Sequence, residues 1–335
     1  MNEGDYPAQL KRLVNGFRVS QCIHVAVELA IADHLRGGAR SCAVLAERTG
    51  SQPAALERLL RVLARAGIVH RESDGRFALT PLGELLCKDA DGSMRAEIRN
   101  NLHASSWAAW GQLLYSVETG QAAFPKIFGK SAWEYRAENP EAGRIFDEMA
   151  RSMSARSRDV ILNCLDLSNV RRVVDVGGGD GTLLAGILAR WPALQGVLFD
   201  RPAVTAKAER VLNVAGVRDR CRIVAGDFFD EVPAGGDLYL LKAIIHDWDD
   251  KAAIAILNNC RQAMTNDASI VLVESLLDPD SPDDRAFMDL HMLVIHGGLE
   301  RTPAEFGALF DASGFRLDRV QRTGTGPDLI HGKPA

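Results

Sequence analysis

The apolar residues in the first third of the chain recur at three- and four-residue spacing, which predicts amphipathic helices. One such pattern covers residues 10–36, where the apolar positions run from Val19 to Leu35. It predicts one long helix, which either packs in the core of its own domain or contacts a second copy of the chain.

The pattern between residues 41 and 87 predicts a winged helix. A short helix ends at Gly50, and Ser51 is expected to cap a second helix that has Pro53 in its first turn. An Asp74-Gly75 turn then joins two short strands, and a further helix follows.

The charge of this segment bears on whether it binds DNA, as the second helix of a winged helix does in regulators. Eight arginines and four acidic residues lie between positions 36 and 76, so the local net charge is 8 − 4 = +4. The whole chain has 39 basic and 44 acidic residues and a net charge of −5, whereas nucleic-acid-binding chains are usually basic. These charges favour a scaffold role for the winged helix and no nucleic-acid partner.

Residues 96–165 are predicted to be helical and carry many large apolar side chains. These side chains form either a helical core or the wall of a ligand pocket, because a pocket for a small molecule needs apolar walls. The candidates for a pocket wall are Trp107, Phe124, Phe128, Met149 and Met153.

From about residue 170 onward, short apolar runs alternate with helical patterns, which predicts a doubly wound α/β domain. Within it, residues 201–216 are expected to form one helix and residues 237–245 one strand, and the last two strands a hairpin. The chain therefore divides into a mainly helical winged-helix domain at 1–95, a helical segment at 96–165 and an α/β domain at 166–335.

A glycine-rich turn, Asp175 to Gly181, follows the first predicted strand of the α/β domain and opens a helix. Glycines such as Gly177 and Gly179 let a ligand approach the backbone there, and the helix N-terminus offers free N–H groups. A dinucleotide site would have G-x-G-x-x-G, but Thr182 stands in place of the third glycine. The Asp175 carboxylate would repel a pyrophosphate and attract a cationic amino-acid ligand, so the turn favours S-adenosylmethionine over a dinucleotide.

Two further loops offer groups that suit a nucleoside. Asp200 and Arg201 end the second strand, where an acid accepts hydrogen bonds from both ribose hydroxyls or else caps the next helix. Gly226, Asp227 and Phe228 follow the third strand. There the carboxylate can hold an adenine amino group while the phenyl ring covers the adenine.

Three ionisable residues lie after the later strands and are candidates for catalysis. His246 titrates near neutrality, so it can act as a general base on a hydroxyl group. Glu274 and Glu300, if they converge on His246, can fix its tautomer and stabilise its cation. No metal is expected, because the acids that follow are interpreted as a helix cap and surface charges; they lie at 247, 249 and 250.

The cysteines and the chain's hydropathy indicate where the protein resides. Six cysteines are scattered without the spacing of a zinc site or a disulfide framework, which favours free thiols in a reducing cytoplasm. No run of 18 apolar residues occurs, and the first residues lack the apolar core of a signal peptide. We therefore expect a cytoplasmic protein without a membrane partner.

A known family shares six motifs with this chain in order and spacing: DVGGGDG, FDRP, GDFF, LLKAIIHDWDD, VLVES and GGLERT. With them, almost the whole chain resembles the small-molecule O-methyltransferases of the plant caffeate and bacterial antibiotic-tailoring type. The resemblance implies a homodimer formed through the N-terminal helices, a seven-stranded class I methyltransferase domain, and S-adenosylmethionine as methyl donor.

The resemblance also assigns roles to single residues. It implies that His246 is the base, bracketed by Glu274 and Glu300. It places Lys242 among the cofactor residues, with Gly177, Asp200, Asp227 and Phe228. It implies an acceptor pocket whose walls include Asp247, His291, Met292 and His296.

Several alternatives stay open on the sequence alone. The acceptor is expected to be a planar aromatic or polyketide-like phenol, but methylation of a nitrogen or a carboxyl group is an alternative. A second is an enzyme of this fold that catalyses a pericyclic, decarboxylating or hydroxylating reaction. A third is a winged-helix regulator that senses S-adenosylmethionine.

Overall fold

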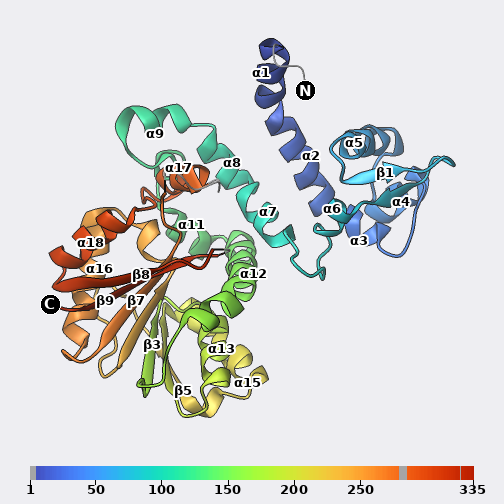
Figure 1. Cartoon of the computed structure of the whole chain (residues 1–335). Coiled ribbons are helices and arrows are strands. Elements are labelled where there is room, and N and C mark those ends of the chain that lie inside the picture. The colour runs from blue at the N-terminus through green and yellow to red at the C-terminus, as the bar shows by residue number, and fades with distance from the viewer. Residues whose placement is uncertain (1–4, 279–284, 325) are drawn as a thin grey trace. The chain divides into compact units, whose positions relative to one another are not determined.

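The computed structural model describes residues 5–278, 285–324 and 326–335 (Figure 1). The chain forms two compact units. One contains residues 5–107 and 141–152, and the other contains residues 108–140 and the described part of 153–335. In the described part of the chain, no helix is both long and apolar enough to cross a membrane.

The N-terminal unit is mostly helical. Its elements are α1 (Tyr6–Val14), α2 (Gly16–Glu28), α3 (Ile31–Leu35), α4 (Cys42–Thr49), α5 (Pro53–Arg65), β1 (Val69–Arg71), β2 (Phe77–Leu79), α6 (Pro81–Glu84) and α7 (Arg95–Asn101). The antiparallel pair of β1 and β2 follows α4 and α5, as expected for a winged helix. The core of this unit joins apolar side chains of α2 to α5 with those of the hairpin.

The prediction of one helix over residues 10–36 is wrong. The helical run ends at Val14, starts again at Gly16 and ends at Glu28. A third helix begins after Ala30, whose φ of +51° is left-handed and interrupts the helical path.

The expected cap of the second winged-helix helix is also wrong. The side chain of Gln52, not Ser51, accepts a hydrogen bond from the backbone of Ala55 at 2.6 Å and caps α5. Ser51 Oγ instead accepts a hydrogen bond from Thr49 Oγ1 at 2.8 Å. Pro53 does occupy the first turn, and Gly50 ends α4 with a φ of +64°.

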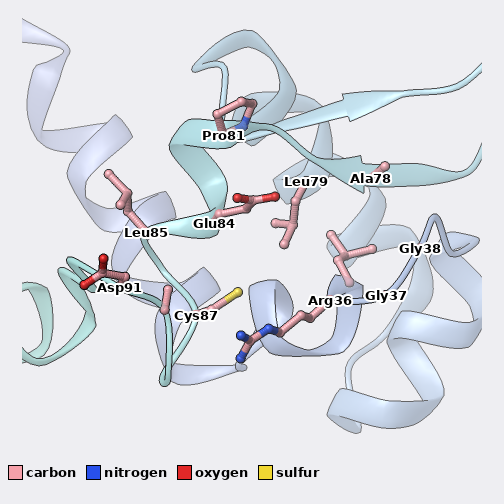
Figure 2. Close-up of a pocket in the computed structure, with 12 residues that line it drawn as sticks. Arg36, Gly37, Gly38, Ala78, Leu79, Pro81, Glu84, Leu85, Cys87 and Asp91 are labelled. Atoms are coloured by element: carbon pink, nitrogen blue, oxygen red, sulfur yellow. The ribbon is translucent and has the colours of Figure 1, made fainter.

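A hollow of about 560 Å³ lies within the N-terminal unit (Figure 2). Its lining combines the end of α3, strand β2 and the segment around α6. The charged side chains of Arg36, Glu84 and Asp91 lie around it together with the apolar side chain of Leu79. Both signs of charge are present, so the hollow has no strong preference for an anion or a cation.

A helical segment precedes the α/β domain. It comprises α8 (Ala104–Trp110), α9 (Leu113–Thr119), α10 (Ala123–Phe128), α11 (Ala132–Glu138) and the long α12 (Pro140–Cys164). The prediction that residues 96–165 are helical is confirmed. One helix that the sequence pattern did not indicate, α17 (Arg285–Ile295), packs against α9 and α10.

The second unit is built on a seven-stranded sheet in the order β5-β4-β3-β6-β7-β9-β8. The five parallel strands are β3 (Arg172–Val176), β4 (Gln195–Asp200), β5 (Cys221–Ala225), β6 (Leu238–Lys242) and β7 (Ser269–Glu274). A C-terminal antiparallel hairpin, β8 (Phe315–Gln321) and β9 (Asp328–Pro334), completes the sheet and confirms the predicted pair.

Helices cover both faces of this sheet (Figure 1). On β6, Tyr239 and Leu241 face a core that includes α16 (Asp250–Ala263) and α18 (Pro303–Ala312), while Leu238 and Leu240 face the opposite core. The opposite core includes α13 (Thr182–Arg190), α15 (Ala208–Val214) and the end of α12. Because both faces are buried, these strands are continuously apolar, as in parallel sheets generally.

Two local expectations for this domain are wrong. Residues 201–216 form two helices, α14 (Pro202–Thr205) and α15, rather than one. The strand expected over residues 237–245 stops at Lys242, because Ala243 has a φ of +52° and a single 3₁₀ turn, η2 (Ile245–Asp247), follows.

The strand order places a ligand site at one edge of the sheet. The first strand, β3, pairs with β4 on one side and with β6 on the other, so the strand order reverses there. Ligands of open α/β sheets bind outside the carboxyl ends of the strands at such a reversal. The glycine-rich turn follows β3 and the His246 segment follows β6, so both lie at this edge.

Candidate active site

The glycine-rich turn leaves room for a ligand through its backbone conformation. Gly177, Gly179 and Gly181 have φ values of +70°, +62° and +81°, which side-chain-bearing residues rarely adopt. A Cβ at Gly177 would lie 2.4 Å from Cδ1 of Ile244, so the Ile244 side chain would have to move to admit any other residue. Asp200 Oδ2 accepts a hydrogen bond from the Gly179 N–H at 2.9 Å and joins the turn to the end of β4.

Asp175 lies directly beneath this turn. Its side chain is buried, and a Cβ at Gly178 would approach Asp175 Oδ2 to 2.7 Å. Burial, and next the negative charge of Asp200, raise the pKa of Asp175 to about 7. Oδ2 is enclosed and has no hydrogen-bond partner among the described residues.

The loop after β5 lies next to the glycine-rich turn. Asp227 Oδ1 accepts a hydrogen bond from the Phe229 N–H at 2.9 Å, and Gly226 donates one to the Asp200 carbonyl at 3.1 Å. Phe228 lies edge-on to Trp248, and its ring would come within 3.8 Å of a Cβ at Gly177. The structure therefore brings the three sequence-predicted nucleoside loops together.

Arg201 and Lys242 contribute positive charge near this edge. The Arg201 guanidinium lies 5.4 Å from the centre of the Trp133 ring. Lys242 Nζ donates a hydrogen bond to Ser154 Oγ at 3.3 Å. Burial lowers the pKa of Lys242, while the negative charges of Glu274 and Asp175 oppose this.

His246 lies within a group of three carboxylates. Its Nδ1 is 2.9 Å from Glu300 Oε1 and 3.8 Å from Glu274 Oε2, and its Nε2 is 3.8 Å from Asp247 Oδ1. Burial disfavours the imidazolium, but the negative charges of Glu274, Asp247 and Glu300 outweigh it and raise the pKa of His246 to about 10. The predicted convergence of Glu274 and Glu300 on His246 is present in the structure.

The Glu274 carboxylate holds the His246 segment from one side. Its Oε1 accepts hydrogen bonds from the backbone N–H groups of Ile244 and Ile245 at 3.1 and 2.8 Å. Burial raises the pKa of Glu274 to about 7, although the charge of His246 opposes this. Glu274 thus acts on the backbone as well as on the imidazole.

Arg301, which the sequence reasoning did not single out, holds the same segment from the other side. This fully buried guanidinium donates hydrogen bonds to the carbonyls of Ile245 and Trp248 at 3.1 and 2.8 Å and to Asp250 Oδ1. Gly298 packs so closely against this segment that a Cβ at its position would lie 2.1 Å from the His246 carbonyl oxygen. The motif GGLERT contains both residues, but their contacts with the His246 backbone are not readable from it.

The interpretation of the three acids after His246 needs one correction. Asp249 caps α16 as expected, and Asp250 is an exposed partner of Arg301. Asp247, in contrast, is 8% exposed and is not a surface charge. Burial raises its pKa to about 6, while the positive charges of His246 and Arg136 oppose this.

Residues from α17 and α11 extend the cluster beyond His246. His296 Nε2 lies 3.8 Å from Asp247 Oδ1, and the His296 ring packs against Trp133. The Arg136 guanidinium lies 4.9 Å from the centre of the Trp133 ring. His291 accepts a hydrogen bond from Trp110, and the neighbouring Met292 is buried. The sequence reasoning missed Trp133 and Arg136 because nothing in a helical run marks a residue as facing the site.

The remaining pocket candidates lie in different surroundings. Phe124, 3% exposed, packs with Phe128 and Tyr135 in an aromatic cluster. Met153 precedes Ser154, the partner of Lys242, on α12. Trp107 and Met149 belong to the N-terminal unit.

The described residues include no group of three or more metal-binding side chains of His, Cys, Asp or Glu that could hold a metal ion. The seven-stranded sheet, the glycine-rich turn after its first strand and the acid at the end of the next define a methyltransferase-type nucleoside site.

Comparison with known proteins identifies the family. Residues 110–316 match the model of an O-methyltransferase domain, and residues 11–89 match that of an O-methyltransferase dimerisation domain. The chain belongs to the family of S-adenosylmethionine-dependent O-methyltransferases that carry this dimerisation domain.

Its similar relatives are bacterial natural-product enzymes. A phenazine O-methyltransferase of Lysobacter antibioticus is 40% identical over 97% of this chain and 95% of its own length. A phenazine-1-carboxylate N-methyltransferase of Pseudomonas aeruginosa is 33% identical, with 96% of each chain covered.

Solved structures agree with these relatives. The mitomycin 7-O-methyltransferase has a TM-score of 0.95 and 36% identity, with 98% of each chain covered. An O-methyltransferase from neocarzinostatin biosynthesis, solved with S-adenosylmethionine and 2-hydroxy-5-methyl naphthoic acid, has a TM-score of 0.85 and 31% identity, with 94% of this chain and 96% of that chain covered.

Proposed function

We propose that this enzyme transfers a methyl group from S-adenosylmethionine to a phenolic hydroxyl of a small aromatic natural product, with His246 as the general base. The observation that carries the proposal is the pairing of His246 Nδ1 with Glu300 Oε1 at 2.9 Å. It fixes the ring so that Nε2 is the atom left to take up a proton. The aromatic acids and phenazines named for the relatives support an aromatic acceptor.

The residues at the carboxyl edge of the sheet fit the cofactor. The glycine-rich turn has a cradle at Gly177 that a Cβ would fill, and the Asp200 carboxylate at the end of β4 is of the kind that accepts hydrogen bonds from ribose hydroxyls. Asp227 and Phe228 suit the adenine, and Lys242 adds a half-buried cation. When bound, S-adenosylmethionine would supply an electrophilic methyl group on a sulfonium for the acceptor oxygen.

Proton removal is the step that falls to this chain. A free phenol has a pKa of about 10 and a free imidazole one of about 6.5, so complete transfer between them in water is unfavourable. The carboxylates around His246 raise its pKa to about 10, close to that of the phenol. At neutral pH the imidazole is therefore mostly protonated, and the neutral form that serves as the base increases as the pH approaches 10. Glu300 and Glu274 thus make the imidazole a stronger base and hold it in place.

A substitution of His246 tests the role of the base. We expect His246→Ala to lower kcat about 10²–10⁴-fold on phenolic acceptors, the usual contribution of general-base catalysis. The affinity for S-adenosylhomocysteine, measured by calorimetry, should change less than about twofold, because the nucleoside loops are untouched. His70→Ala, at an exposed histidine of β1, is the matched control. Equal turnover by His246→Ala and wild type would exclude His246 as the base.

We also propose that the N-terminal helices form a homodimer. Along α1 and α2, large apolar side chains are exposed, with Tyr6 at 73%, Leu13 at 76% and Phe17 at 50%. Several large exposed apolar side chains on neighbouring helices are typical of an interaction site. Sedimentation of the wild type should give a dimer, and Leu13→Glu should shift it toward monomer. A wild type that sediments as a monomer would contradict the proposal.

A further inference from the structure

The His291 ring is held in one tautomer by Trp110. The indole Nε1 lies 3.0 Å from His291 Nδ1, and the two rings stack. An indole nitrogen can only donate a hydrogen bond, so Nδ1 must be the acceptor. Burial and the positive charges of Arg136 and His246 lower the pKa of His291 to about 4. The ring is therefore neutral at pH 7, and its one proton lies on Nε2.

The Nε2–H group of His291 is a free donor. In the described part of the chain, Trp110 is the hydrogen-bond partner of this side chain, and Nε2 does not belong to the enclosed polar atoms. His296 differs, because its Nδ1 is enclosed and without a hydrogen-bond partner among the described residues. Of the two α17-segment histidines, His291 is thus the one that offers a hydrogen bond to a molecule from outside.

His291 belongs to the same side-chain cluster as the proposed base. His246 Nε2 and His296 Nε2 both lie 3.8 Å from Asp247 Oδ1. His291 precedes His296 by five residues, so it lies about 7.5 Å away along the helix axis and on a different face of the helix. The positive charges of Arg136 and His246 nevertheless reach its ring. A ring system that presents a hydroxyl to His246 can therefore extend as far as His291.

We propose that His291 determines acceptor specificity by donating a hydrogen bond from Nε2 to a carbonyl-type oxygen, of a ketone, quinone or carboxylate, on the ring system that carries the reacting hydroxyl. This inference rests on the proposed function. An uncharged donor fixed by an indole suits an oxygen that can only accept, and the nearby Arg136 charge favours an oxygen with negative charge. A hydroxyl at that position would match less well, because it brings a second hydrogen-bond donor next to the fixed Nε2–H donor.

Binding to matched probes tests this assignment. One pair is 6-hydroxy-2-naphthoate and 2-naphthol; the other is 6-acetyl-2-naphthol and 2-naphthol, so that the carbonyl lies on the ring away from the hydroxyl. Calorimetric titration of the full-length protein, saturated with S-adenosylhomocysteine, measures affinity without relying on turnover. We expect the carbonyl-bearing member of at least one pair to bind about tenfold more tightly, which is the value of one well-made hydrogen bond. The pair that shows the preference tells a carboxylate from a neutral carbonyl.

Four variants separate the donor from the shape of the ring. His291→Phe should reduce the preference to less than about twofold, because it keeps a ring and removes the donor. His291→Gln should restore it, since its amide N–H reaches the place of Nε2, whereas the shorter amide of His291→Asn should not. Trp110→Phe should weaken the preference in part, because the tautomer is no longer fixed.

The outcomes distinguish the two proposals. A wild type with no preference in either pair, or a His291→Phe variant that keeps the preference, would overturn the role of His291. Absence of methyl transfer to any probe, with the binding preference intact, would count against the proposed reaction and leave the role of His291 standing.

Discussion

The proposed cofactor side and the proposed acceptor side of this site are built by different means. On the cofactor side, the ligand space is shaped by backbone conformation at Gly177 and by carboxylates at strand ends, such as Asp200. On the acceptor side, side chains from α8, α11, η2 and α17 converge, and rings such as Trp133 and His296 pack on one another. The first arrangement suits one invariant ligand, whereas the second can change its specificity by single side-chain substitutions.

The His246 segment joins the two sides, and its support should be the part of the molecule that is most sensitive to substitution. Replacing Arg301 with Met removes hydrogen bonds to the carbonyls of Ile245 and Trp248 and leaves them buried. We expect a loss of about 3 kcal/mol in the free energy of unfolding, because each buried carbonyl left without a partner costs about 1–3 kcal/mol. Chemical denaturation measures it, with Arg76→Met as an exposed control that should change stability by less than about 0.5 kcal/mol. A loss no larger than the control's would show that the His246 segment does not depend on Arg301.

Because backbone conformation shapes the cofactor side, we expect that side to be sensitive to backbone changes. Gly177→Ala should lower the affinity for S-adenosylhomocysteine by more than about tenfold, because its Cβ meets Ile244 and its φ of +70° is strained. Gly179→Ala is the matched control: its φ is similar, at +62°, but its Cβ would meet no atom within 4 Å. Calorimetry compares the two variants, and equal losses would mean that backbone strain rather than space governs this turn.

The same comparison explains which parts of the site can be predicted from the sequence. Glycines, strand-end acids and His246 stand at fixed places in a local strand–turn–helix pattern, so their positions follow from the chain itself. The contacts of Arg301 and the approach of Trp133 to His296 join segments far apart in the sequence, and no local period encodes them. The same holds for fold details: the break at Ala30 depends on one left-handed residue that periodicity does not reveal.

The charge around His246 gives a prediction for the pH dependence of the reaction. The carboxylate of Glu300 is one of three that raise the pKa of His246 to about 10. In Glu300→Gln this pKa should fall, so the rise of kcat/KM with pH should move by about one unit to lower pH. The plateau should decrease because the imidazole is a weaker base. Rate profiles from about pH 7 to about 11 measure both effects, and an unchanged rising limb would mean that Glu300 does not act on His246.

The smallest expected effect concerns the loss of folding stability that is caused by burying Asp175 on the cofactor side. Asp175 has a pKa raised to about 7, so its charged form destabilises the folded chain above that pH, and the cost disappears as pH falls toward the value of about 3.8 for a free aspartate. We expect Asp175→Asn to raise the free energy of unfolding by about 2 kcal/mol at pH 8 and by little at pH 4. The same variant should bind S-adenosylhomocysteine less tightly, since it loses the negative charge that the Asp175 carboxylate places next to the glycine-rich turn. A gain in stability that is equal at both pH values would show that the effect is one of packing, and that the acceptor side alone carries the pH-sensitive charges of this site.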